Sequence, residues 1–135
     1  MKKLYILITF GITFIANSYG QHYFSCEYTN ICTWNSKTKK FDICEGTEES
    51  SLFKINKEET VITLNCESGK YSYFINSSEH KDENKSIMYA TTCNNGKEYI
   101  INVDLTNDEI HILQVKTEYI TPMKAYFIKK IWSDE

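Results

Sequence analysis

The sequence predicts an all-β protein: an antiparallel meander of about nine or ten strands, closed or partly open as an up-and-down barrel, with a two-sheet sandwich as the alternative. Three observations predict this class. Apolar and polar residues alternate with a period of two, short polar segments separate the alternating stretches, and no apolar stripe of useful length has helical spacing. Closure into a barrel is the simplest way for such a meander to remove its edge strands.

Residues 1–20 have the features of a cleaved secretory signal peptide. Two lysines precede an apolar run at residues 4–16, and small residues at positions 18 and 20 suit a cleavage site. The run is short of the ~20 apolar residues that span a bilayer. We therefore expect a secreted or periplasmic mature chain, residues 21–135, that forms a single β domain without a membrane span.

The mature chain is acidic and contains no arginine. All 15 basic residues are lysines, and two of them belong to the leader, which leaves 13 basic residues against 18 acidic ones. Arginine supplies the planar fork that recognises phosphate and guanine. Its absence, together with the negative net charge, argues against a nucleic-acid partner.

The first two hairpins follow from their polar turns and apolar pairs. Residues 36–39 separate two short strands, and residues 57–59 separate two longer ones. The second pairing places apolar residues on one face, as a half-buried sheet requires. The cross-strand pairs expected here are Trp34 with Phe41, Phe53 with Leu64, and Ile55 with Ile62.

Three further turns carry the pattern to a last strand at residues 124–132. They are residues 67–70, the Asn-Asn-Gly segment 94–96, which is the strongest hairpin signal in the chain, and residues 106–109. The pairs expected across the first and third of these turns are Cys66 with Tyr71, Leu64 with Tyr73, Ile62 with Ile75, Val103 with Ile112, and Leu105 with Ile110.

Alternating connections would bring all five cysteines to the same end of the sheet: Cys26, Cys32, Cys44, Cys66 and Cys93. In an oxidising compartment disulfide bonds are the default, and an odd count leaves at least one thiol unpaired. Connectivity stays open. We favour Cys32 with Cys44, which would face each other if their hairpin were shifted by one residue from the apolar pairing. Cys26 and Cys32 cannot bridge along one extended strand, where six residues span ~20 Å, but they could if Asn30 turns the chain.

The orientation of Cys93 depends on the turn that follows it. A two-residue turn would place Cys93 opposite Glu98 and away from Tyr99. A three-residue turn ending in Gly96 would place it opposite Lys97, on the face of Tyr99.

Chemistry other than disulfide formation has weaker support. The chain contains no Cys-x-x-Cys pair of the kind that binds zinc, and the pattern places no cation next to a cysteine that would activate its thiol. We therefore expect no metal and no cofactor. The histidines His22, His80 and His111 lack partners at triad spacing. Paired carboxylates coincide with turns, which favour such residues without catalysis. We therefore expect no enzyme and name no catalytic residue.

Tyr71, Tyr73 and Tyr99 share the apolar face that the pairing predicts. If the barrel is open inside, their hydroxyls would orient a buried ligand. If the barrel is filled, they are core residues whose hydroxyls reach the rim or each other. The filled interior is favoured, because the other inward candidates are large and eight-stranded interiors are only wide enough to fill.

Several segments resemble short, uncharacterised secreted proteins found in Bacteroidota. They are "ANSYGQ" at the end of the leader, "SLFKIN-KEETVITLNC-ESGKYSYFI", "NNGKEYIINVDLTNDEIHIL" and "FIKKIW". The similarity covers roughly residues 51 to 132. It implies an extracytoplasmic β-meander protein and carries over no activity or site.

These observations favour a non-enzymatic binding or interaction module, secreted or periplasmic and stabilised by disulfides. Its partner would contact exposed strands or the acidic loop near Glu45, Glu48 and Glu49. The alternative is a carrier that holds a small apolar ligand inside the barrel, against Tyr71, Tyr73 and Tyr99.

Overall fold

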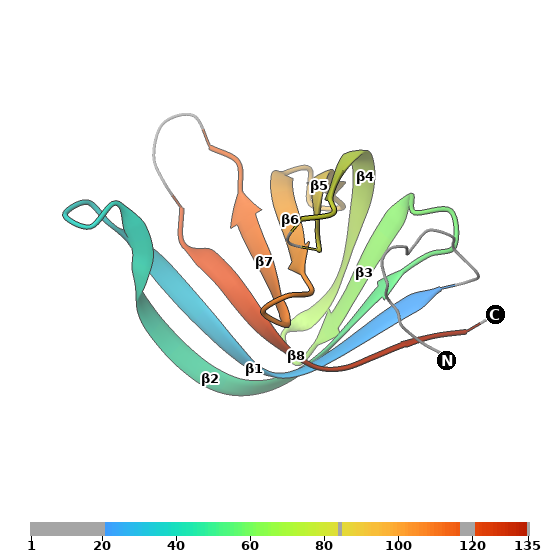
Figure 1. The fold of residues 1–135 in the computed structure, drawn as a ribbon, viewed down its shortest axis with the longest axis horizontal. Coiled ribbons are helices and arrows are strands. Elements are labelled where there is room, and N and C mark those ends of the chain that lie inside the picture. The colour runs from blue at the N-terminus through green and yellow to red at the C-terminus, as the bar shows by residue number, and fades with distance from the viewer. Residues whose placement is uncertain (1–20, 84, 117–120, 135) are drawn as a thin grey trace.

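The computed structural model describes residues 21–83, 85–116 and 121–134, and these form eight antiparallel strands. The strands pair in chain order, and β8 returns to β1, so the sheet closes into a barrel (Figure 1). The expected all-β meander is confirmed, as a barrel rather than a sandwich, whereas the expected leader lies outside the described residues. The strands are β1 (His22–Asn35), β2 (Lys40–Ile55), β3 (Val61–Cys66), β4 (Gly69–Lys81), β5 (Ser86–Cys93), β6 (Glu98–Asp104), β7 (Glu109–Gln114) and β8 (Met123–Ser133). No helix in this part of the chain could cross a membrane by its length and apolar character.

The count of nine or ten strands is too high because β1 and β2 are long and continuous. β2 has 16 residues and includes the polar stretch 45–50, which the sequence suggests is a loop. Gly46 lies in this stretch opposite Asn30, and a Cβ at this glycine would collide with the hydroxyl group of Tyr28 on β1. The glycine therefore makes room for an aromatic ring that crosses over β2 and keeps the polar stretch in the sheet.

The first two hairpins have the apolar register that the sequence predicts. The rings of Trp34 and Phe41 meet edge to face with centroids 5.2 Å apart. The pairs confirmed in this way are Trp34 with Phe41, Phe53 with Leu64, and Ile55 with Ile62.

The hairpins β3–β4 and β6–β7 are registered two residues away from expectation. A shift of two residues keeps every side chain on its face, so the apolar pattern cannot detect it. The turn decides instead: β4 begins at Gly69, whose φ of 144° suits glycine, and only two residues separate it from Cys66. The observed pairs are Cys66 with Gly69, Leu64 with Tyr71, Ile62 with Tyr73, and Val103 with Ile110. The expected pairs that prove wrong are Cys66 with Tyr71, Leu64 with Tyr73, Ile62 with Ile75, Val103 with Ile112, and Leu105 with Ile110.

The turn after Cys93 follows the three-residue alternative. The backbone N–H of Cys93 donates to the carbonyl of Lys97 at 2.8 Å, and Gly96 closes the turn with a φ of 87°. Cys93 is consequently buried on the same face as the Tyr99 ring.

Large side chains fill the interior of the barrel. Its core is continuous, and the bulkiest members have almost no exposed surface, with Tyr89, Phe53 and Ile101 at 1 % or less. The core residues are Phe24, Cys26, Phe53, Ile55, Ile62, Leu64, Tyr73, Ile87, Tyr89, Cys93, Ile101, Val103, Ile110, Ile112 and Tyr126.

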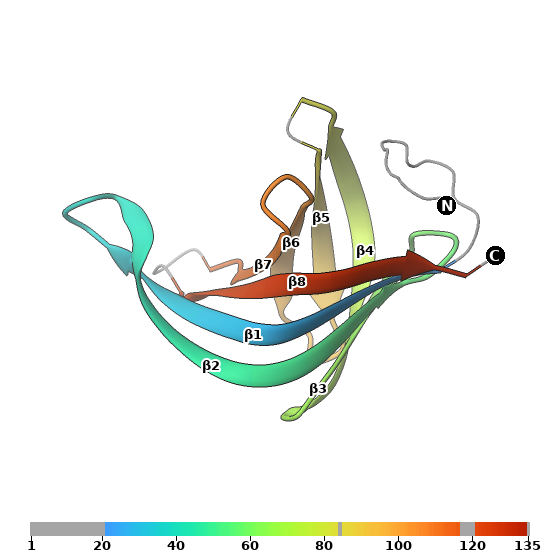
Figure 2. The ribbon, with the colours of Figure 1, turned by 60° about the horizontal axis from the view of Figure 1, so that its bottom comes forward.

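The strands are staggered, so parts of the sheet extend past the barrel at both ends. The β1–β2 hairpin extends on one side, and the end of β8 extends with the start of β1 on the other (Figures 1 and 2). Asp134 joins the two chain ends there: its backbone N–H donates to the carbonyl of Gln21 at 3.1 Å, and its carboxylate accepts from Tyr23 at 2.9 Å. We call the hairpin beyond the barrel, residues 28–48, the overhang.

Candidate functional site

The tyrosines expected on one face do come together inside the barrel. Tyr73 is buried, Tyr71 and Tyr99 pack against the core, and the rings of Tyr73 and Tyr99 meet edge to face at 5.4 Å. Burial raises the pKa of Tyr73 far above its ordinary value, with smaller contributions from Cys93, Tyr126, Tyr99 and Tyr71. The Tyr73 phenol therefore stays neutral at physiological pH, and the three rings act as packing groups with polar tips.

The sequence analysis did not identify two further tyrosines of the interior, Tyr89 and Tyr126. Tyr126 packs edge to face on Phe53 at 4.9 Å. Tyr89 is fully buried, and its hydroxyl donates to Glu59 at 3.0 Å, which brings the β2–β3 turn over one end of the barrel. The alternation of Ile87, Tyr89, Thr91 and Cys93 along β5 carries the signal that would have found Tyr89.

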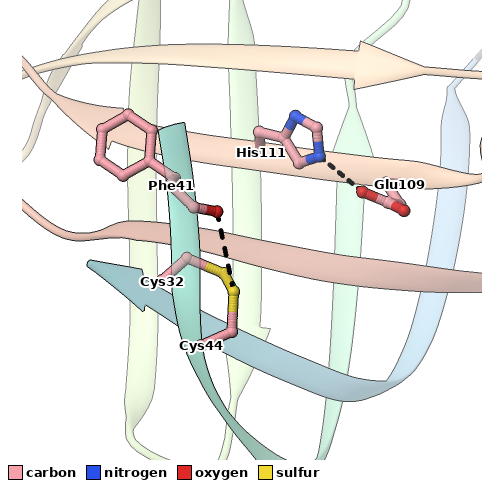
Figure 3. The surroundings of a disulfide bond; sticks show 5 residues. All are labelled: Cys32, Phe41, Cys44, Glu109 and His111. Atoms are coloured by element: carbon pink, nitrogen blue, oxygen red, sulfur yellow. Dashed lines mark hydrogen bonds and ion pairs between the residues drawn. A yellow bond between two sulfur atoms is a disulfide. The ribbon is translucent and has the colours of Figure 1, made fainter. Parts of the chain in front are cut away.

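The favoured disulfide is present, between Cys32 on β1 and Cys44 on β2 (Figure 3). A β-bulge between Thr33 and Trp34 shifts the hairpin by one residue, so Trp34 still faces Phe41 while the cysteines face each other. The Sγ atom of Cys44 lies 3.8 Å from the carbonyl oxygen of Phe41. The bond therefore fixes the register of the overhang.

The other three cysteines are free thiols. Cys26 is buried opposite Ser51, and burial raises the pKa of its thiol to about 12. Cys66 is half-buried, and its Sγ lies 3.2 Å from the hydroxyl of Ser68. Cys26 and Cys93 are inert core thiols, which leaves Cys66 as the accessible one.

The expectation that all five cysteines share one rim is wrong for the disulfide. Cys66 and Cys93 end strands β3 and β5, which run in the same direction in this meander. Cys32 lies six residues beyond Cys26 on the continuous strand β1, or ~20 Å at the rise of a β-strand. The disulfide therefore belongs to the overhang and not to the barrel rim.

The histidines occupy separate places. The ring of His22 contacts Ser133 Oγ at 2.7 Å, and that of His111 contacts the carboxylate of Glu109 at 2.7 Å (Figure 3). Burial lowers the pKa of His22, against opposing charges on Glu59 and Asp134. Among the described residues, no group of three or more His, Cys, Asp and Glu side chains could hold a metal ion.

The acidic segment near Glu45, Glu48 and Glu49 is a strand and not a loop. β2 pairs with β1 through the overhang, but its pairing with β3 covers only Ser51 to Ile55. Within the described part of the chain no strand covers the other side of residues 42–50, which we call the β2 edge. Seven consecutive residues of this edge, 42–48, are exposed. Apart from the N–H of Ser50, which donates to the Glu67 carboxylate, the backbone groups on that side have no partner strand among the described residues and are open to a further strand.

The chemistry of the β2 edge suits recognition. It carries four carboxylates and no basic residue, and it also carries Ile43, a large apolar side chain that is 55 % exposed. A shallow groove of about 350 Å³ lies at its root, between β2 and the end of β3. In this groove the Ser51 hydroxyl is buried without a hydrogen-bond partner, and the Glu67 carboxylate accepts from the backbone N–H of Ser50 at 3.5 Å.

Comparisons of the chain with protein-family models, with curated proteins and with solved structures gave no match.

Proposed function

We propose that the chain is a secreted or periplasmic, non-enzymatic interaction module, in which the β2 edge accepts an extended strand from a protein partner. The observation that carries this proposal is the pairing of β2, which has β1 on one side throughout and β3 on the other side only from Ser51 onwards. Strand addition would supply main-chain hydrogen bonds to the uncovered side, and side chains of the edge would select the partner.

The lack of lysine and proline on the β2 edge supports this role. Proteins protect exposed edges with lysine, proline, bulges or covering loops. Residues 42–50 contain no lysine and no proline, and the disulfide at Cys44 holds the strand extended. Between the two β-bulges at its ends, the edge runs in regular register from Ile43 to Glu48, and such a regular edge is suited to pairing.

The disulfide also supports a secreted or periplasmic location. Disulfides persist in oxidising environments such as the periplasm and the cell exterior. This agrees with the leader expected at residues 1–20 and with the resemblance to secreted Bacteroidota proteins, both of which remain predictions.

A carrier of a small apolar ligand has less support. The positions such a ligand would occupy are taken by side chains such as Phe53, Tyr89 and Ile101. Tyr71, Tyr73 and Tyr99 contact each other and the core, so their rings are already in use.

A photo-crosslinking amino acid at Thr47 tests the proposal in the organism that encodes the chain. Thr47 is exposed on the β2 edge, whereas Lys54 lies on the same strand with Tyr23 and Thr63 paired on its two sides, so it serves as the control. We expect a specific crosslinked product at Thr47 that is absent at Lys54 and is lost in the variant Glu45→Lys/Glu48→Lys. Absence of any product at Thr47, from a protein that is folded and exported, would contradict the proposal.

A further inference from the structure

The end of β8 forms a second uncovered edge. β7 pairs with β8 only up to Phe127, and the last bond on that side runs from the N–H of Ile128 to the carbonyl of Asp108 at 2.8 Å. Beyond it β8 pairs with β1 alone within the described residues. We call residues 128–133 the β8 edge. It carries two exposed apolar side chains, Ile131 at 46 % and Trp132 at 38 %.

The charges of the two edges are opposite. The β8 edge carries Lys129 and Lys130 and no carboxylate, whereas the β2 edge carries Asp42, Glu45, Glu48 and Glu49 and no base. The nearest carboxylate after the β8 edge, Asp134, is already bonded to the backbone N–H of Gln21 and to Tyr23. Lys129 pairs with the exposed Glu27 carboxylate of β1 at 2.9 Å, and Lys130 lies over the Trp132 ring at 5.7 Å.

A third uncovered edge, on β4, does not show this complementarity. β4 pairs with β3 only as far as Phe74, which leaves residues 76–81 paired with β5 alone among the described residues. Its side chains include Glu79, His80 and Lys81, of both signs. Charge therefore singles out the β2 edge and the β8 edge as matching surfaces.

The matching edges face away from each other. β2, β1 and β8 are neighbours in one curved ribbon, with the β2 edge along one side at one end and the β8 edge along the other side at the opposite end (Figures 1 and 2). One molecule cannot join its own two edges. Two molecules can, and each would still present one edge of each kind.

We propose that the strand accepted by the β2 edge is the β8 edge of a second copy of this chain, so that copies add head to tail into a continuous ribbon. This inference rests on the proposed function and names its partner. The contact is heterologous, so it extends into an open series unless the rotation between copies closes a ring. Ion pairs between exposed lysines and carboxylates contribute to it, so salt weakens it.

Charge reversal on each edge tests the inference. The chain is expressed with its own leader, its free thiols are alkylated, and sedimentation velocity is recorded at about 0.05 M and about 1 M salt, where screening differs strongly. We expect assemblies larger than one chain at low salt that dissociate at high salt. Glu45→Lys/Glu48→Lys should be monomeric, because two lysines and two carboxylates leave its β2 edge without net negative charge to match the basic β8 edge. Lys129→Glu/Lys130→Glu should be monomeric, because both of its edges are acidic.

Mixing the two variants tests directly whether the two edges pair with each other. The unaltered basic β8 edge of the first variant then meets the unaltered acidic β2 edge of the second, so we expect a complex of one molecule of each variant that forms only in the mixture. Circular dichroism of each variant alone checks that the barrel is folded. A wild-type chain that stays monomeric at low salt, assembly that persists in either variant, or a mixture of folded variants that stays monomeric would overturn the inference. A foreign protein crosslinked at Thr47, with no copy of the chain, would also overturn it while leaving the proposed function in place.

Discussion

The two halves of β2 differ in what surrounds them. From Ser51 to Ile55 the strand has a neighbour on each side, and its side chains alternate between buried and half-buried. From residue 42 to residue 48 it has one neighbour, and every residue is exposed. The same strand is therefore part of the packed barrel in one half and an exposed edge in the other, so we expect the two halves to differ in their contribution to stability.

The largest expected effect on stability comes from removing a core side chain in the barrel half of β2. Phe53 is 1 % exposed and packs on Tyr126, so Phe53→Ala should lower the free energy of unfolding by about 3–5 kcal/mol through lost burial and a residual cavity. Ile43→Ala, in the overhang, should change it by less than about 0.5 kcal/mol. Urea unfolding measures both, and similar costs at the two positions would refute the division.

The disulfide variant tests whether the overhang unfolds with the barrel. Cys32 and Cys44 are 12 residues apart in sequence, so Cys32→Ser/Cys44→Ser should cost about 2–3 kcal/mol by the chain-entropy account. Amide hydrogen exchange should become faster in the overhang and keep its protection order in β3 to β6. Intact mass provides the control: the wild-type chain should be two hydrogens lighter than its fully reduced form, since only one pair of its five cysteines is bonded.

A smaller effect on stability is expected at Gly46, which lies against the Tyr28 ring in the overhang. Gly46→Val places a side chain where the Tyr28 hydroxyl lies, so the ring must leave, and we expect a cost of about 1 kcal/mol. In the background Tyr28→Ala the same substitution should cost less, because only the end of the Asn30 side chain, whose Oδ1 lies 2.6 Å from the new Cβ, still has to move. A double-mutant cycle in urea measures the difference, and equal costs in the two backgrounds would show that Tyr28 does not constrain this position.

The smallest effect is a pH dependence at the other end of the barrel. The pKa of His22 is lowered from its ordinary 6.5, mainly by burial, so the folded state resists protonation. As pH falls through 6.5, the unfolded state takes up the proton first, and stability decreases until the pH is below the lowered pKa of the folded state. His22→Gln should flatten this part of the profile, measured by urea unfolding between about pH 8 and about pH 5. A profile unchanged by the substitution would show that another group titrates there.

The sequence could predict the fold class because period-two alternation and polar turns follow from the pleated strand itself. It could also predict the facing pairs of β2 and β3, since the apolar set admits one face. It could not set the registers of β3–β4 and β6–β7, because a slip of two residues leaves Leu64 and Val103 on the same face. Only the turn geometry, at Gly69 in the first case, distinguishes the two.

The candidate site was predictable in composition and not in shape. The carboxylates near Glu45 and Glu48 were evident, but polar composition indicates a loop unless a ring such as that of Tyr28 holds the stretch in a sheet. The β8 edge was missed because "FIKKIW" gives the strand without its neighbours. Where β7 stops pairing is a property of the stagger between strands, and that is set by closure of the whole barrel.

The bond between Gln21 and Asp134 has a consequence for the order of the strands along the polypeptide. Because His22 pairs with Ser133 and the backbone N–H of Asp134 reaches the carbonyl of Gln21, the barrel is a ring of eight strands with no structural first member. A short linker from Asp134 to Gln21, with new ends opened in the tight turn at residues 94–96, would keep every strand pair. Such a circular permutant would place its ends between β5 and β6, neither of which pairs with β8, so that a tag could be appended without extending the β8 edge.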